Sequence, residues 1–222
     1  MAKRVTSKTS TALAIVPISQ PASVPSADPV SEPELAKPRV FIHDVCTDHP
    51  DLSYSRYWWD QKHDREGITP WIAKKLCPGD DPIFGHAAKA EVLLPPTAPS
   101  DYMDVHFLTS QFDRTLPSFE KHAMVQMKLF LDQQEAWHIG YERVRSFARA
   151  HFAATHPVIL IAHVPQIVGL EGNGSHVHCV VLSRGINVNG FTPACTTLCS
   201  DRGYRKALAA WRKHLKAEGK GA

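Results

Sequence analysis

The amino-acid sequence predicts an α+β or α/β domain in which helices pack on a central sheet. One observation is the order of elements in the second half of the chain, which reads as strand, helix, strand, strand. A second is the segment "HPVILIAHVP", a nearly continuous apolar run of strand length that is typical of the centre of a sheet. The third is size and composition, because 222 residues with 43% hydrophobic and 21% charged side chains suffice for one substantial globular domain plus tails.

The N-terminal segment differs in composition from the rest of the chain. Residues 1–38 are rich in Ser, Pro and Ala without periodicity, and such a composition cannot bury enough apolar surface to offset the cost of ordering. We therefore predict a disordered tail over residues 1–38 and a folded domain over residues 39–222. The folded part begins with a strand at "RVFIHDV".

The first half of the domain contains a mixture of short elements. The stretch "DLSYSRYWWDQKHD" is dense in aromatic residues, and "TPWIAKKL" predicts a short helix that opens at Thr69 and Pro70. A short strand in "KAEVLLPPTAP" ends at paired prolines. The following "SDYMDVHFLTSQFDRTLPSFEKH" is expected to be mostly helical with breaks, and "HAMVQMKLFLD" alternates enough to be a strand.

The second half has clearer periodicity. In "DQQEAWHIGYERVRSFARAHFAA", apolar residues recur at helical spacing, with charged residues on the opposite side. The strands "HPVILIAHVP" and "SHVHCVVLSRGI" follow. The last segment, "DRGYRKALAAWRKHLKAEGKGA", predicts a helix with Tyr204, Leu208, Trp211 and Leu215 on one face. It carries seven basic and two acidic residues, so its local charge of +5 exceeds the +3 of the whole chain.

The cysteines and the lengths of the apolar segments predict the cellular location of the protein. The five cysteines are odd in number and scattered, so we predict free thiols in a reducing cytoplasm and no disulfide framework. No apolar run approaches the ~20 residues of a membrane span, and Pro-rich sequence follows the short apolar stretch near the N-terminus where a leader would have a cleavage site. We expect a cytoplasmic protein that does not contact membranes.

Two histidines at alternate positions mark the start of an apolar strand. His176 and His178 point to the same face of that strand, which they share with Val180, Leu182 and Arg184. His163 ends the preceding strand, and if the two strands are neighbours about 5 Å apart, three imidazoles can converge on one ion.

Imidazole nitrogens favour Mn²⁺, Co²⁺, Ni²⁺ or Zn²⁺ over Mg²⁺. The alternative is that the histidines are polar residues at a strand end. A cupin site fits less well, because the glutamate that a cupin motif needs is replaced by Leu182, Ser183 and Arg184.

Four motifs resemble the MobA/MobL family of plasmid mobilisation relaxases. "SHVHCVVLSRGINVNGF" resembles the family's H-x-H pattern, which is followed by an apolar strand, an S-R pair and a G-F turn. "AEVLLPPTAP" looks like its E-I-L-L-P element, "FEKHAMVQMKLFLDQQ" is similar to its helix-to-strand passage, and "YRKALAAWRKHLKAEG" is similar to its closing helix. The four motifs follow the family's order across residues 90–219, more than half the chain.

The resemblance implies an HUH endonuclease fold, an α+β domain whose mostly antiparallel central sheet carries three metal ligands. His163, His176 and His178 match those ligands. The implied cofactor is a divalent metal ion, Mn²⁺ or Mg²⁺ first, with Zn²⁺, Co²⁺ and Ni²⁺ as alternatives. The implied partners are single-stranded DNA at a transfer origin and other mobilisation proteins.

The resemblance also implies an activity, which is strand-specific nicking of DNA in conjugative mobilisation. A tyrosine hydroxyl attacks the scissile phosphate and stays joined to the 5′ end. The family's A-Y-R segment has no counterpart here, so the candidate nucleophiles are Tyr57 and Tyr54 in "SYSRYWW", for which core packing is the alternative role. The acidic residue that follows the first histidine in the family is replaced by Val164 and Pro165, and Glu171 is the candidate substitute.

Basic residues provide candidate DNA contacts. Arg184 either touches a phosphate or pairs with a carboxylate on the sheet face. The basic side of the last helix either follows a DNA backbone through salt-sensitive contacts or is simply solvated; its candidate residues are Arg205, Lys206, Arg212 and Lys213. Three functions stay open at this point: a nicking relaxase, a DNA-binding accessory protein of the same fold without nicking activity, and a metalloprotein unrelated to DNA.

Overall fold

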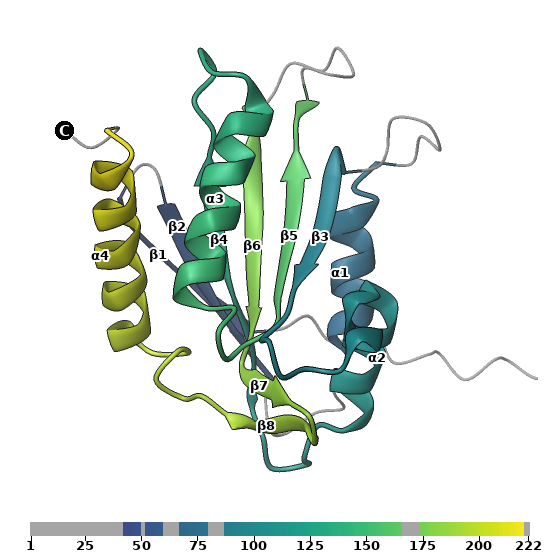
Figure 1. Ribbon diagram of the computed structural model, residues 1–222. Coiled ribbons are helices and arrows are strands. Elements are labelled where there is room, and N and C mark those ends of the chain that lie inside the picture. Colours follow the sequence, from purple (N-terminus) through teal and green to yellow (C-terminus); the bar gives the residue numbers. More distant parts are fainter. Residues whose placement is uncertain (1–41, 50–51, 60–66, 80–86, 166–173, 220–222) are drawn as a thin grey trace, which may run out of the picture. The chain divides into compact units, whose positions relative to one another are not determined.

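A computed structural model describes residues 42–49, 52–59, 67–79, 87–165 and 174–219 (Figure 1). The chain divides into two units, Met1–Lys37 and Pro38–Ala222. The predicted disordered tail lies outside the described residues. The elements of the second unit are β1 (Ile42–His49), β2 (Leu52–Trp58), α1 (Ile68–Leu76), β3 (Lys89–Leu93), a 3-10 helix η1 (Ser100–Met103), α2 (Val105–Arg114), β4 (His122–Phe130), α3 (Trp137–His151), β5 (Val158–His163), β6 (His176–Leu182), β7 (Arg184–Asn187), β8 (Gly190–Ala194) and α4 (Asp201–Ala217).

The centre of this unit is a six-stranded sheet in the order β1-β2-β4-β6-β5-β3, in which every neighbouring pair is antiparallel. Strands β7 and β8 form a separate two-stranded sheet. The predicted α+β class with a central antiparallel sheet is therefore confirmed. Strands β5 and β6 are interior strands of the sheet, and apart from their histidines they are apolar on both faces; every residue of β6 is buried.

The sheet divides the hydrophobic core into two parts, and helices cover both of its faces. On one face, α3 and α4 pack on the alternate strand residues that include Val177, Cys179 and Val181; α3 lies in front of the sheet in Figure 1. On the other face, α1 and α2 pack on the set that includes Val180 and Leu182. The second face is the one to which the side chains of His176 and His178 belong, since strand side chains alternate.

Helix α1 is anchored at its start by α2. Its N-cap residue, Gly67, has no side chain to cap the helix. The Asp113 carboxylate of α2 takes this role and accepts hydrogen bonds from the backbone N–H groups of Ile68 and Thr69 at 2.8 and 3.0 Å. A Cβ atom at Gly67 would clash with the Asp113 carboxylate, so the glycine permits this close approach. The position of α1 matters because its other end reaches the histidines.

Two parts of the fold differ from the sequence-based prediction. The aromatic-rich stretch that had no predicted element forms β2, paired with β1 and β4. The strand predicted for "SHVHCVVLSRGI" ends at Leu182, and Arg184 begins β7 in the small sheet. The turn to β8 is closed by Gly190, whose φ of 94° lies in the region that favours glycine. Among the helices in the described ranges, none is long and apolar enough to cross a membrane.

An ion pair ties β3 to α3. Glu91 of β3 accepts hydrogen bonds from the Arg145 guanidinium at 2.8–2.9 Å, and from the Tyr141 hydroxyl at 3.2 Å. The hydrogen bonds from Arg145 are the main cause that lowers the pKa of the Glu91 carboxyl, although burial acts in the opposite direction. Burial, together with the same carboxylate, raises the pKa of Tyr141.

We expect Glu91→Gln to lower the free energy of unfolding at pH 7 by about 1 kcal/mol, since both partners are partly exposed and water screens the pair. A carboxyl whose pKa is lowered in the folded state stabilises the fold above its unfolded pKa of about 4.3 and loses that effect as pH falls further. The difference between wild type and Glu91→Gln should therefore shrink below about pH 4 in urea titrations. Glu142→Gln, at an exposed position of α3, is the matched control; an equal effect of both variants at pH 7 would contradict the prediction.

Candidate metal site

The three predicted histidines meet at one end of β5 and β6. Strands β5 and β6 are antiparallel neighbours, and their register places His163 directly opposite His176. His178 lies two residues further along β6 on the same face. The predicted adjacency of these strands is confirmed.

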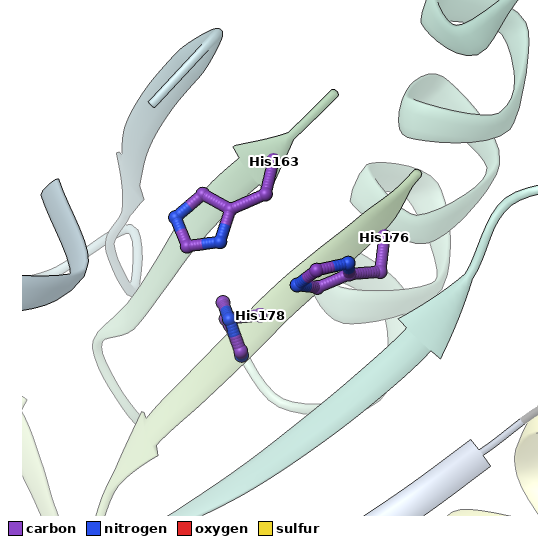
Figure 2. A group of neighbouring side chains, drawn as sticks. All are labelled: His163, His176 and His178. Carbon is purple, nitrogen blue, oxygen red and sulfur yellow. The ribbon is translucent and has the colours of Figure 1, made fainter. Parts of the chain in front are cut away.

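The imidazole rings face one another across a small space (Figure 2). Their ring centroids form a nearly equilateral triangle with sides of 4.9, 4.9 and 5.2 Å, and one nitrogen from each ring lies within 4.8 Å of the other two. His176 and His178 are buried, with exposed fractions of 7% and 5%, while His163 is half-buried. The triad is therefore accessible from the side of His163.

Backbone carbonyls fix the orientation of two of the rings. Nε2 of His163 lies 2.8 Å from the Lys75 carbonyl oxygen, and Nδ1 of His176 lies 3.0 Å from the Gly174 carbonyl oxygen. A carbonyl only accepts, so these two nitrogens carry the proton, and the lone pair of each neutral ring is on the other nitrogen. Ligand histidines in metal sites commonly donate their second N–H to a backbone carbonyl in this way.

The environment keeps the imidazoles neutral. Burial is the main cause that lowers the pKa of all three, to about 4 for His176 and about 2 for His178. The positive charges of Lys75 and Lys128 lower these pKa values further. Neutral imidazoles at physiological pH have the lone pairs that a metal ion requires.

The residues present fit a divalent metal ion. Nδ1 of His178 is buried and has no hydrogen-bond partner in the described part of the chain, so one polar atom of the triad is left unsatisfied by the protein. Nitrogen–metal bonds of about 2.1 Å require ligand atoms roughly 3.4 Å apart in a tetrahedral site, so small ring rotations would close the triad on an ion. Three histidines also leave coordination positions for an outside oxygen. The triad can thus hold a metal ion, and its donor set does not select one metal.

Two lysines beside the triad were missed by sequence reasoning. Lys128 of β4 pairs in register with His178. Lys75 lies at the end of α1, and its backbone carbonyl orients the His163 ring. In a strand over "HAMVQMKLFLD", Gln126 and Lys128 share one face, but whether that face adjoins the histidines depends on the register between β4 and β6. That register was not contained in either segment alone.

The candidate nucleophiles Tyr54 and Tyr57 lie away from the triad. Tyr54 belongs to the core on the opposite face of the sheet, and its hydroxyl donates to the Leu198 carbonyl at 2.6 Å. Tyr57 belongs to the core on the histidine face and packs on Trp71 with ring centroids 5.2 Å apart. By register, however, Tyr57 lies two strands across and four residues along from His178, which is about 10 Å in one direction and about 14 Å in the other.

The remaining tyrosines are also placed elsewhere. The chain has five tyrosines, and the structure describes all of them. Tyr141 and Tyr204 belong to the core beneath α3 and α4, on the face opposite to the histidines. Tyr102 of η1 packs on Phe107 and Phe191. The structure therefore brings the three histidines together and brings none of the five tyrosines to them.

The predicted DNA contact Arg184 is buried in β7 and does not lie on the strand with the histidines. Its guanidinium donates to the Thr192 carbonyl at 2.9 Å, the Phe191 carbonyl at 3.2 Å and the Thr115 carbonyl at 2.9 Å. It also lies over the rings of Phe112 and Phe191. In this environment Arg184 joins the small sheet to α2. The sequence had indicated a phosphate contact or a pair with a carboxylate, and neither alternative included this role.

The basic residues of α4 form an exposed surface on the other side of the domain. Helix α4 packs through Tyr204, Ala207 and Trp211 on the core opposite to the histidine face. Its predicted DNA contacts Arg205, Lys206, Arg212 and Lys213 are all exposed. Their role in DNA binding stays a prediction, and the fold separates them from the triad by the thickness of the sheet.

Two other predictions concern residues away from α4. Glu171, the candidate acidic partner of a ligand histidine, lies outside the described residues. Cys179, Cys195 and Cys199 are free thiols, as predicted.

Comparison with known proteins supports the fold at a distance. No family model matches the chain, and no curated protein matches it. A solved structure described as "Molecular Basis of Vancomycin Resistance Transfer in Staphylococcus aureus" is similar to this chain with a TM-score of 0.57 and 14% sequence identity, covering 77% of this chain and 95% of that one. The likeness shows a shared fold, and it agrees with the predicted α+β fold with a central antiparallel sheet.

Proposed function

We propose that this chain is a relaxase-like protein that binds a divalent metal ion and single-stranded DNA at the histidine triad and nicks the DNA strand at a transfer origin. The observation that carries the proposal is the convergence of His163, His176 and His178, with their neutral rings and open coordination positions. The shared fold with a structure concerned with vancomycin resistance transfer supports a role in such transfer. Other mobilisation proteins stay predicted partners.

The chemistry begins with phosphate binding. The triad would hold a divalent metal ion with two rings fixed by carbonyl hydrogen bonds, and the ion would supply polarisation of a phosphate oxygen. The ammonium groups of Lys75 and Lys128 would offset the negative charge that grows on the phosphate oxygens during the reaction.

In the nicking step, a tyrosine oxygen forms a bond to phosphorus and the bond from phosphorus to the 3′ oxygen breaks. The phenolic proton passes to the departing 3′ oxygen, and the 5′ phosphate stays on the tyrosine. Tyr57 is the candidate on the histidine face. Its phenol, like that of an ordinary tyrosine with a pKa of about 10, is protonated at neutral pH, and burial raises the pKa further. The side chain has to approach the triad to react.

The positions of the tyrosines favour a second candidate function. A protein of this fold that binds DNA and metal without forming a covalent bond needs the triad but no tyrosine beside it. The separation of Tyr57 from His178 by two strands and four residues is the observation that supports this accessory role.

An adduct assay separates the two functions. Labelled single-stranded oligonucleotides spanning candidate transfer-origin sequences are incubated with the protein and Mn²⁺, and covalent adducts are resolved on denaturing gels. We expect a metal-dependent adduct in wild type that is lost in His176→Ala and Tyr57→Phe. The adduct should persist in Tyr54→Phe and in Tyr102→Phe, whose tyrosine packs at η1.

The other outcomes are equally informative. Metal-dependent binding without any adduct, with oligonucleotides that include the true origin, would reject nicking and support the accessory role. DNA binding that does not change on addition of metal or in His176→Ala would reject both functions at this site.

A further inference from the structure

Two lysine–aromatic pairs flank the histidine triad. On α1, the Lys75 ammonium lies 5.2 Å from the centroid of the Trp71 ring. On β4, the Lys128 ammonium lies 4.8 Å from the centroid of the Phe130 ring. One pair therefore comes from a helix and the other from a strand.

The β4 pair lies directly beside the ligand strand. The register between β4 and β6 sets Lys128 opposite His178 and Phe130 opposite His176. Paired residues on one face of neighbouring strands have Cβ atoms about 5 Å apart. The Phe130 ring centroid is 6.2 Å from that of His176. Lys128 and Phe130 thus extend the triad across the sheet toward β2.

The α1 pair borders the triad from the other side. The Lys75 carbonyl accepts a hydrogen bond from His163, which holds the end of α1 against the triad. Both lysines are therefore direct neighbours of the triad, because Lys128 pairs with His178 across the strands and the backbone of Lys75 contacts His163. A divalent cation in the triad adds to this positive charge, so the complete site attracts an anion with more than one negative group.

The exposed ring beside these charges indicates the class of anion. Phe130 is 42% exposed, although it ends a strand whose other apolar residues are almost all buried. Exposed aromatic rings alternating with ammonium groups are typical of surfaces that bind single-stranded nucleic acids, because bases stack on the rings while phosphates contact the cations. Duplex DNA hides the base faces and would leave the ring unused.

We propose that Lys75, Lys128 and Phe130 form the surface that binds single-stranded DNA. The two ammonium groups contact phosphates on either side of the triad, and one base stacks on the Phe130 ring. This inference rests on the proposed function, since the triad supplies the central phosphate position. It assigns DNA binding to the histidine face, in place of the basic surface of α4 on the opposite face.

The test is the salt dependence of oligonucleotide binding by the full chain. Fluorescence anisotropy of a labelled oligothymidylate is titrated at several salt concentrations, without metal and with Mn²⁺. We expect Lys75→Gln and Lys128→Gln each to reduce the slope of log affinity against log salt by about 0.7, the contribution of one phosphate contact in a single strand. Phe130→Ala should weaken binding about tenfold and leave the slope unchanged.

Matched controls are available for each change. Lys74→Gln removes the same charge at an exposed neighbouring position of α1, and Phe119→Ala removes a phenyl ring that is 80% exposed in the loop before β4. Both should bind like wild type. Thermal unfolding of every variant by circular dichroism checks that the fold is retained.

Several results would overturn the inference. They are absence of binding by the wild type, equal losses in the controls, or wild-type binding by Lys75→Gln and Lys128→Gln while Lys213→Gln on α4 is weakened. The adduct assay tests the proposed function independently of this surface. Weaker binding by the two lysine variants, without any adduct in wild type, would support the surface and reject nicking. An adduct in wild type, with unchanged binding by the two variants, would support nicking and reject the surface.

Discussion

Replacement of His178 by alanine is expected to reduce the affinity for Mn²⁺ by about 100-fold or more, since even loss of a residue that only supports a ligand costs 10–100-fold. His178 is the most buried member of the triad, and its Nδ1 has no other hydrogen-bond partner in the described part of the chain. Isothermal titration calorimetry of the purified protein with Mn²⁺ measures the effect directly.

The same protein offers a control and an independent readout. His138→Ala removes an exposed histidine of α3 and should leave the metal affinity unchanged. A bound ion stabilises the folded state by about 2.7 kcal/mol at 100 times its dissociation constant, so Mn²⁺ should raise the melting temperature of wild type and of His138→Ala. Equal metal affinity in His178→Ala and wild type would show that the triad is not the metal site.

Replacement of Arg184 by methionine is expected to destabilise the domain by on the order of 3 kcal/mol, because three carbonyls lose a charged donor. The guanidinium joins β7, β8 and the end of α2 through hydrogen bonds to Thr192, Phe191 and Thr115. At about 2–4 °C per kcal/mol for a chain of this size, the melting temperature should fall by roughly 10 °C. Urea unfolding followed by circular dichroism provides the free energy.

The control separates structural support from DNA contact. Arg205→Met removes an exposed guanidinium of α4, and its effect on stability should stay within about 0.5 kcal/mol. If Arg184→Met were as stable as wild type but bound DNA more weakly, the phosphate contact predicted from the sequence would be right and the structural role wrong.

The ligands of the candidate site could be predicted from the sequence because local pattern determines them. The apolar run that ends at His163 and the alternation around His176 and His178 specify two buried strands, and strands consecutive in sequence are usually neighbours in space. The helices α1, α3 and α4 were likewise predicted from caps and periodicity, which also depend on residues close in sequence.

The surroundings of the ligands depend on contacts between distant segments. Lys128 adjoins His178 only because β4 pairs with β6 in one particular register, and a shift of one residue would move it to the other face. The end of β6 at Leu182 also could not be read from the alternation, which continues through Arg184 without interruption.

Prediction of the strand β2 from the sequence would have narrowed the choice between the two candidate tyrosines. Tyr54 and Tyr57 are three residues apart, and an odd separation in a strand places side chains on opposite faces. Once the aromatic-rich stretch is known to form β2, at most one of them can share a face with the histidines. The structure identifies that residue as Tyr57.

The hydrogen bond between His163 and the Lys75 carbonyl makes the end of α1 part of two binding events. An ion that fixes the His163 ring also holds the last turn of α1, and with it the Lys75 ammonium that we assign to a DNA phosphate. Each ligand should then bind more tightly when the other is present, and by the same factor, because thermodynamic linkage is reciprocal. Metal affinity measured with and without oligonucleotide would reveal this cooperativity, which would restrict tight DNA binding to protein already loaded with metal.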